Sequence, residues 1–535
     1  MHKWIQNWSI TGVISLMLVA CGGGGGDSET TTTTTTIPTT TTPVDTTASH
    51  QVLAFNDLGM HCADLDYSTF VILPPFNVVH TQVIERGSEP RILDISGVDV
   101  RYQGVMDTSG TSINTTSQNL AGSVWKTNFW DVNPDTGNKY VFDLFGLDPQ
   151  PDEGLAFGQT MPGILNPYMA NDPQDFNHYD PDKQWFAADG IPILPIDDSG
   201  QLNAYPMMKI SASDKATGTT LADLDVVLPV ASEADCQNCH ALGEVAAPVS
   251  STIDFMPPDD INDPNSVLQA AKHNILALHD AKQGTDLLNQ TPVLCASCHY
   301  SAALDLAQSG PNPEQSTHDK MSVVMHSHHG QLTDPATGDL LFPSDGTLEE
   351  TCYQCHPGKI TKCLRGAMGS ADIVCQDCHG GMLAVGSETR EPWLEEPRCE
   401  SCHTGDALSN LAGETGVVVN SVDSSGNVDN IRLRQTYKTD PNVDTVIASN
   451  KRFAEGDGTL YRNSLGHGGV ACEACHGSTH AIWPTTSAND NQTAITLQGH
   501  SGTITECAVC HTSVPLNLEG PHGMHVVDND AWELR

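Results

Sequence analysis

The chain is poor in basic residues, with 24 Lys and Arg against 66 Asp and Glu and a formal net charge of −42 over 535 residues. Nucleic acid is therefore excluded as a partner, because no basic patch is present to neutralise its phosphates. Beyond the first twenty residues, no apolar run approaches the roughly eighteen residues that a bilayer-spanning helix needs. The acidity keeps the protein soluble and favours cations, positively charged surfaces or other redox proteins as partners.

Aromatic residues are also scarce, at 6%, whereas the chain has 17 Cys and 23 His. The pattern C-x-x-C-H occurs seven times, where this composition predicts about 0.02 copies by chance. The seven copies are Cys236, Cys239 and His240; Cys295, Cys298 and His299; Cys352, Cys355 and His356; Cys375, Cys378 and His379; Cys399, Cys402 and His403; Cys472, Cys475 and His476; and Cys507, Cys510 and His511.

C-x-x-C-H is the attachment motif of a c-type haem. Two thiols add across the two vinyl groups of one porphyrin, and the histidine that follows ligates the iron. Zinc ribbons need no histidine after each C-x-x-C, and a thioredoxin-like motif would occur once. The sequence therefore predicts seven covalently bound haem c groups, with the fourteen cysteines above as attachment sites and the seven histidines as iron ligands.

The start of the chain is a targeting segment. His2 and Lys3 precede an apolar stretch from Ile10 to Ala20, which is too short to span a bilayer. The following "LVAC" resembles the lipobox of bacterial lipoproteins, which implies cleavage before Cys21 and acylation of that residue. Gly22, rather than Asp, follows and favours the outer membrane. The alternative is an ordinary cleaved signal peptide in which Cys21 is incidental.

Four regions are expected: a lipoprotein signal peptide at 1–20, a Gly/Thr/Pro-rich tether at 21–49, a β-rich domain at 50–231 and a seven-haem domain at 232–535. Alternating apolar positions such as Val98, Val100 and Tyr102 predict a sandwich or barrel-like fold for the β-rich domain. At roughly 43 residues per haem, the last region is too short to build an apolar core round each macrocycle, so we expect the haems to form its core.

The overall fold class is α+β, with a mostly irregular, short-helix haem domain. Its clearest helix is expected over Ser266 to Lys282, where Leu268, Ala271 and Leu278 share one face with His279. The segment of about 404–464 contains no Cys or His beyond His403, and its Val-rich stretches predict an inserted β-hairpin.

Each iron also needs a sixth ligand or stays open, and bis-histidine ligation gives the lower potentials. Histidines near the motifs, or in the β-rich domain, are the candidates. They are His61, His80, His279, His318, His326, His329, His467, His480, His500, His522 and His525. Met321 and Met325 are further candidates, although methionine is more often a core residue.

Seven C-x-x-C-H motifs, a lipobox, a tether and a β-rich N-terminal region together resemble the outer-surface multihaem c-type cytochromes of metal-reducing bacteria. The resemblance implies an exported outer-membrane lipoprotein, exposed at the cell surface beyond the periplasm. It implies an electron-transfer wire that passes electrons to extracellular acceptors, such as ferric iron or other cytochromes.

The alternative is a multihaem reductase of nitrite, hydroxylamine or sulfur-oxyanion type, which needs one open haem with acid–base groups around it. All seven motifs end in His, and Tyr300, directly after the second motif, is the candidate acid–base group that the sequence places beside a haem. The electron-carrier interpretation is preferred to an enzyme, and no catalytic residue is assigned.

Cys62 and Cys363 are left over after the motifs and Cys21. Cys363 with Cys378 and His379 also spells C-x14-C-H, which is similar to long-spaced attachment motifs of some filament-forming cytochromes, so Cys363 could replace Cys375. The short motif is preferred, and we then expect Cys62 and Cys363 to form a disulfide between the two domains. Two buried thiols are the alternative.

Overall fold

A computed structural model of the chain describes residues 47–105, 173–195, 204–390, 461–478 and 490–513 with short gaps, the tripeptide 136–138, and two strands between 418 and 434. Residues 41–535 form one unit, and the description below concerns that unit alone.

Some of the predicted features lie outside the described residues. They are the signal peptide and tether, the candidate ligands His480, His522 and His525, and the whole fifth motif with Cys399, Cys402 and His403. Haem attachment at Cys399 and Cys402, with His403 as the iron ligand, therefore stays a prediction from the sequence. In the fourth motif, only the backbone of Cys378 is described, so haem attachment through its side chain also stays a prediction from the sequence.

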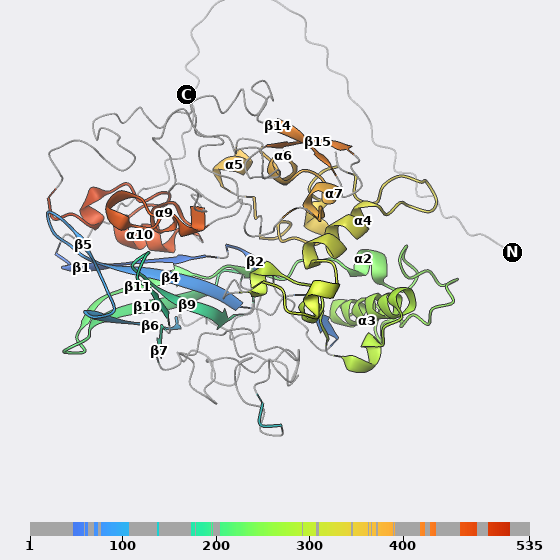
Figure 1. The fold of residues 1–535 in the computed structure, drawn as a ribbon, viewed down its shortest axis with the longest axis horizontal. Helices are drawn as coiled ribbons and strands as arrows, with labels where there is room; N and C mark the ends of the chain where they lie inside the picture. The colour runs from blue at the N-terminus through green and yellow to red at the C-terminus, as the bar shows by residue number, and fades with distance from the viewer. Residues whose placement is uncertain are drawn as a thin grey trace, which may run out of the picture. The chain divides into compact units, whose positions relative to one another are not determined.

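The first of two larger sheets is antiparallel and follows the order β1-β4-β9-β8, with β5 also paired to β4 (Figure 1). Its register places His50 opposite Glu85 and Asn56 opposite Val79. The strands are β1 (His50–Asn56), β4 (Phe76–Glu85), β5 (Arg91–Leu93), β8 (His178–Asp180) and β9 (Trp185–Pro192).

The second sheet is also antiparallel and follows the order β11-β10-β6-β7. Its strands are β6 (Val98–Gly104), β7 (Gln174–Asp175), β10 (Met207–Asp214) and β11 (Thr220–Val227). Val98, Val100 and Tyr102 are buried along β6 while the residues between them are more exposed, as the period of two predicts.

One apolar core joins the two sheets. Val83, Ile191 and Ile210 are fully buried in it. The same core takes in four residues from the last two described haem motifs and their surroundings: Ala471, Ala474, Leu497 and Val509. The β-rich region therefore buries side chains of the haem-motif region as well as its own.

Two short parallel pairs follow, of which the first lies within the β-rich region and the second links that region to the haem-motif region. β12 (Val230–Ala231) pairs with β2 (His61–Cys62), and β13 (Val293–Leu294) pairs with β3 (Phe70–Val71). The second pair is supported by Lys272, which is 1% exposed and donates from Nζ to the carbonyl of Phe70 at 3.1 Å.

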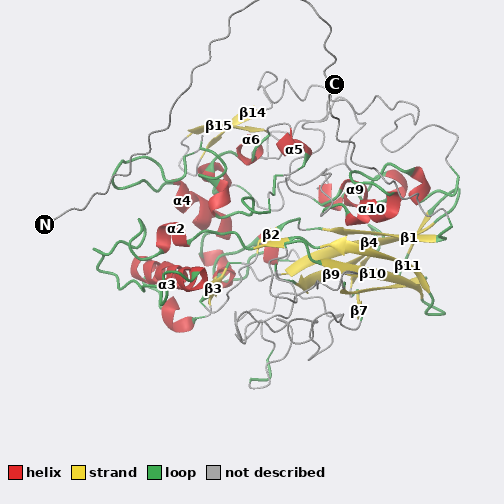
Figure 2. Ribbon diagram, turned by 180° about the vertical axis from the view of Figure 1, so that it is seen from behind, coloured by secondary structure: helices red, strands yellow, loops and turns green. Residues whose placement is uncertain are grey.

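The one long helix in the described residues is α3 (Pro264–Gln283) (Figure 2). Asp263 caps its first turn by accepting from the Asn265 N–H at 3.0 Å, and Gly284 ends it at a φ of 70°. The other α-helices have three to seven residues: α2 (Gln237–His240), α4 (His328–Gly330), α5 (Ala367–Ser370), α6 (Cys375–His379), α7 (Met382–Val385), α9 (Cys472–His476) and α10 (Gln492–Gln498).

Single 3₁₀ turns make up most of the remaining helical structure. They span Leu287–Gln290, Cys295–Ser297, Ala302–Leu304, Gln315–Thr317, Cys352–Gln354, Tyr461–Asn463, His467–Gly469 and Cys507–Val509, and a π-helical turn spans Val323–Ser327. β14 (Val418–Val422) and β15 (Val428–Arg434) form the predicted antiparallel hairpin. No helix in the described part of the chain has the length and hydropathy needed to cross a bilayer.

The mixed α+β content, the sheets in the N-terminal half and the short helices that follow confirm the coarse fold prediction. The predicted helix is confirmed, but its most buried face differs from the expected one. Ala270, Ala271 and Ala277 are buried, whereas Leu268 and Leu278 are half-buried. Small alanines allow the helix backbone to approach its neighbours closely, so this face packs more tightly than the leucine face.

Candidate functional site

Each described C-x-x-C-H motif forms one helical turn. The histidine N–H donates to the carbonyl of the first cysteine at 3.0 Å from His240 to Cys236 and from His299 to Cys295. The distance is 2.8 Å from His356 to Cys352 and from His511 to Cys507. The fourth and sixth motifs form α6 and α9. Residues i, i+3 and i+4 share a helical face, so this turn brings both sulfurs and the imidazole to one side.

The thiols of the described motifs are mostly half-buried. Burial raises the pKa of the Cys475 thiol to about 12 and that of the Cys355 and Cys510 thiols to about 11. The thiols are therefore protonated at neutral pH. A thioether, which carries no charge, suits such a position better than a thiolate.

Four of the six described motif histidines face a second histidine. The ring centroids are 6.5 Å apart for His240 and His329 and for His279 and His299. They are 5.9 Å apart for His326 and His356 and 6.1 Å apart for His467 and His511.

These separations fit a metal ion between the rings. A metal–nitrogen distance of about 2.0 Å on each side, with the distance from nitrogen to ring centre added, gives a centroid separation of about 6 Å. Aromatic rings in ordinary contact also lie about 4.5–7 Å apart, as His329 and Phe342 do at 6.0 Å, so the separation agrees with a bound metal but does not by itself require one. The residues present therefore fit haem iron held between two imidazoles.

Hydrogen bonds set which ring nitrogen is available. Nδ1 lies 2.8 Å from the Asp319 carbonyl in His299 and 2.8 Å from the Ser322 carbonyl in His326. In His329, Nδ1 lies 2.6 Å from the Met325 carbonyl. A carbonyl only accepts, so Nδ1 carries the proton and Nε2 keeps the lone pair that binds a metal.

Burial favours the same neutral form. It lowers the pKa of His240 to about 4, and neighbouring histidines lower it further. Burial likewise lowers the pKa of His326 to about 3. Neutral imidazole is the ligand form, so these rings are ready to coordinate at neutral pH.

His299 has two histidines near it, since His318 lies 5.7 Å away by ring centroid, in addition to His279. His318 is exposed and its Nε2 lies 3.2 Å from a Glu314 carboxylate oxygen. In His279, Nδ1 is hydrogen-bonded to the Thr285 hydroxyl at 2.8 Å, which leaves Nε2 as the nitrogen that could bind a metal. His279 is therefore the better sixth ligand of the second haem.

The remaining described candidates lie elsewhere. His61 is buried on β2. His80 is stacked on Trp185 at 4.3 Å, and burial lowers its pKa to about 4. His500 lies 3.8 Å from Glu506. Met321 and Met325 lie on the segment that carries His326 and His329. The candidates that form the four pairs with motif histidines are therefore His279, His326, His329 and His467.

A hollow lies beside the sixth motif. Cys475 and His476 line one side, and Phe55 and Val226 of the two sheets line another. Its cavity volume of about 60 Å³ is far below the roughly 300–1,000 Å³ of a ligand pocket, so the hollow as it stands does not hold a macrocycle. The β-rich region thus supplies part of the wall of this site.

The structure contains no covalent bond at any described cysteine side chain, those of the haem motifs included, so the Cys62–Cys363 disulfide stays a prediction from the sequence. Cys363 is buried with Met60 and Ala231, and Ala231 is the register partner of Cys62. The fold therefore brings Cys363 against the strand pair that contains Cys62.

The pairing of histidines could not be read from the sequence. His467 stands five residues before the sixth motif but faces His511 of the seventh. His326 and His329 are one turn apart and face the third and first motifs, respectively. Their i, i+3 spacing is the one sequence signal that indicated a shared role.

The sequence also did not predict the contacts that join one motif to another. No protein family, no curated protein and no solved structure matches this chain.

Proposed function

We propose that the protein is a multihaem c-type cytochrome that transfers electrons and performs no bond chemistry. The observation that supports this most strongly is the recurrence of histidine ring pairs about 6 Å apart at the first, second, third and seventh motifs. Such a pair occupies both axial positions of an iron, which leaves no position for a substrate.

Haem supplies an iron that changes reversibly between the ferric and ferrous states. The cysteines of each motif hold the macrocycle covalently, and the motif histidine binds from one side. The second histidine binds from the other side. Carbonyls on Nδ1 of His299, His326 and His329 orient the rings and increase their basicity, which favours the ferric state and a low potential.

The reductase alternative receives no comparable support. The Tyr300 hydroxyl, the candidate acid beside the second motif, donates to Asp305 at 3.0 Å. That motif also has His279 opposite His299. A catalytic haem would need an open axial position with a proton donor facing it.

The acceptor and location follow from charge and from the resemblance. A net charge of −42 favours positively charged partners, and we infer ferric minerals or other cytochromes as acceptors. The lipobox-like "LVAC" and the tether support an outer-membrane lipoprotein with the haem region outside the cell. Attraction to an oxide surface should weaken as salt screens the charges.

Two measurements test the proposal on the purified, membrane-extracted protein. Intact mass should exceed that of the polypeptide and its acyl groups by seven haems. Dithionite-reduced protein should be reoxidised by a soluble ferric chelate without consuming nitrite or hydroxylamine. A protein without covalent haem, or one that turns over nitrite, would show that the proposal is wrong.

A further inference from the structure

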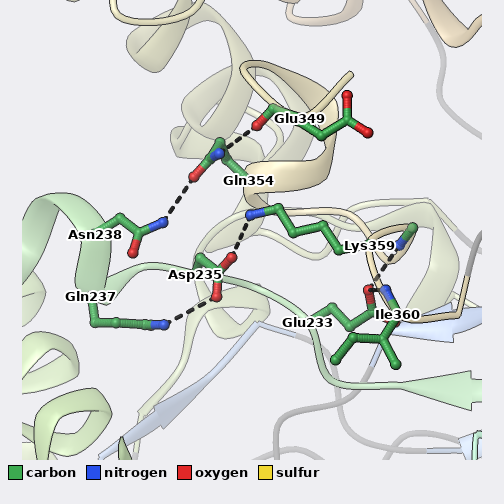
Figure 3. A network of polar contacts seen from close by, with 9 residues as sticks. Glu233, Asp235, Gln237, Asn238, Glu349, Gln354, Lys359 and Ile360 are labelled. Carbon is green, nitrogen blue, oxygen red and sulfur yellow. Dashed lines mark hydrogen bonds and ion pairs between the residues drawn. The ribbon is translucent and has the colours of Figure 1, made fainter. Parts of the chain in front are cut away.

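Polar contacts made by residues within and beside the first and third motifs join the two motifs (Figure 3). Asn238, inside C-Q-N-C-H, donates from Nδ2 to Oε1 of Gln354, inside C-Y-Q-C-H, at 3.0 Å. The Asp235 N–H donates to the Gln354 carbonyl at 2.9 Å. Lys359 forms an ion pair with the Asp235 carboxylate at 2.5 Å. These contacts hold two motif turns, 116 residues apart at Asn238 and Gln354, in one arrangement.

Glu233 adds a second clamp beside the first. Its carboxylate accepts from the backbone N–H groups of Gly358, Ile360 and Thr361 at 2.9–3.0 Å, directly after the third motif. Partial burial opposes ionisation of Glu233, but hydrogen bonds from Thr361 and the backbone outweigh it and hold its pKa below the usual value. A carboxylate with three N–H donors fixes the chain after the third motif with charge-assisted bonds.

The third motif is also held against the fourth. Gln376, inside the fourth motif, donates from Nε2 to Oγ1 of Thr351, which directly precedes Cys352, at 3.2 Å. The same amide donates to the Gly346 carbonyl at 3.2 Å, in the segment that leads into the third motif. The third motif therefore has a neighbour on each side.

The candidate axial histidines also connect the first and third motifs. His326 and His329 stand on consecutive turns of one segment and face His356 of the third motif and His240 of the first. One short piece of backbone thus supplies ligands to both sites, in addition to the clamp formed by the polar contacts. Two independent sets of contacts bring together motifs that are not consecutive in the sequence.

We propose that the haems at the first, third and fourth motifs form one contiguous run with the third at its centre, and that Asn238 and Gln354 are positioning residues that set the spacing between the first and third. The proposal rests on the proposed function, because it takes the motifs to carry haem. The cysteines of a motif would bind the edge of its porphyrin, so motif turns in direct contact would bring porphyrin edges near one another.

The consequence is a short step for an electron. Haem held at these motifs would supply a reversible one-electron ferric–ferrous couple, and the contacts of Asn238 and Gln354 would keep the first and third couples close together. Because tunnelling rates fall steeply with edge separation, electrons should pass between the first and third haems without visiting the second. The order of motifs in the chain is then not the order of the wire.

Magnetic coupling between ferric low-spin haems tests this order. Adjacent haems should broaden and shift one another's electron paramagnetic resonance signals in the oxidised protein. Changing Cys352 and Cys355 to Ala removes the third haem, and the signals of the first and fourth should then become those of isolated haems. The matched variant changes Cys295 and Cys298 to Ala, which removes the second haem and should leave the first–third–fourth signal in place.

Removal of the third haem could prevent folding, so a second variant changes the contact between motifs and keeps all the attachment cysteines. The double change Asn238→Ala and Gln354→Ala should alter the coupling of one haem pair and the potentials of its two members. Asn289→Ala, which breaks a 2.7 Å exposed bond to Asp286 away from any motif, is the control and should alter neither.

Haem content and spin state are measured first in every variant. Seven low-spin haems, with the signals and potentials unchanged by Asn238→Ala and Gln354→Ala, would overturn the inferred order and leave the proposed function standing. Absence of covalent haem would overturn both.

Discussion

The two halves of the described chain are stabilised in different ways. Between residues 50 and 231, two sheets bury a continuous core in which Tyr102, Ile191 and Ile210 have no exposed surface. From residue 232 onwards, the described helices other than α3 have seven residues or fewer, and the groups that converge are histidine rings and half-buried cysteine thiols. Side chains alone form the core of the first half, whereas the second half gathers ligands and attachment groups.

If the second half carries the proposed haems, the difference leads us to expect that it depends on them to fold. Single helical turns are unstable without packing, because helix nucleation is unfavourable and isolated short helices do not persist in water. The motif turns have few buried apolar neighbours, although the last two also rest on the sheet core through Ala474 and Val509. Covalent haems would supply the missing apolar surface.

The largest expected effect comes from removing the cofactors. When the chain is expressed without haem attachment, we expect the second half to be unfolded and the sheets to remain. Limited proteolysis should then leave a fragment of about residues 47–231 and remove the rest. Equal protection of both halves in the haem-free chain would contradict the comparison.

The next effect concerns the contact between the halves. Arg462 forms a bidentate ion pair with buried Asp57, with Nε to Oδ1 at 3.0 Å. Asp57→Ala leaves the guanidinium without its partner and should cost about 3–5 kcal/mol in the free energy of unfolding. The control is Asp175→Ala, which breaks an exposed pair with Arg101 and should cost about 0–1 kcal/mol. Denaturant unfolding of both variants measures the difference, and similar costs would show that the buried pair does not join the halves.

A substitution in the sheet core tests whether the first half can be destabilised without affecting the haem sites. Ile210→Ala should destabilise the sheets by about 2–5 kcal/mol, because it leaves a cavity between them. The haem absorption spectrum of the native protein should stay the same. Ile261→Ala, at a site that is 75% exposed, is the control and should be nearly neutral. Loss of haem absorbance in Ile210→Ala under native conditions would show that the halves do not behave separately.

A ligand substitution tests the second half without unfolding it. His329→Met should raise the potential of one haem, because a thioether favours ferrous iron, by a fraction of the roughly 0.8 V that axial ligands span. His318→Met should leave all potentials unchanged, because His279 occupies the position opposite His299. Potentiometric titration decides, and a shift in His318→Met alone would reassign the second haem.

The smallest effect is a dependence on pH. Hydrogen bonds hold the pKa of Glu233 below its usual value in the folded protein, so its ionised form stabilises the fold. This contribution is present above the unfolded pKa and is lost as the pH falls through the lowered folded value. Glu233→Gln should therefore reduce stability at neutral pH and show a weaker loss on acidification. An unchanged acid transition in this variant would exclude the clamp as a contributor.

The sequence predicted what depends on local patterns. Period-two stretches identified β6 and β11, the helix predicted over Ser266 to Lys282 lies within α3, and the Val-rich insertion forms β14 and β15. It named His326, His329 and His467 as ligand candidates but could not pair them with motifs. Pairing depends on tertiary contacts such as that between Asn238 and Gln354, which no local spacing encodes.

The predicted disulfide shows the same limit. Counting cysteines left Cys62 and Cys363 together, and the fold does bring Cys363 beside Ala231, the neighbour of Cys62 in the parallel pair. Counting could not show whether the two sulfurs meet in the geometry that a disulfide needs. Cys363 packs with Met60, Ala231 and Tyr205, and the disulfide itself stays a prediction from the sequence.

Carbon monoxide titration of the fully reduced seven-haem protein tests the central claim most directly, because the gas binds only ferrous haem with an open axial position. Paired histidines at His240, His299, His356 and His511 predict that at least these four haems show no carbon monoxide difference spectrum. Stoichiometric binding to more than three haems per chain would contradict the account, because the histidine pairs would then not be axial ligands.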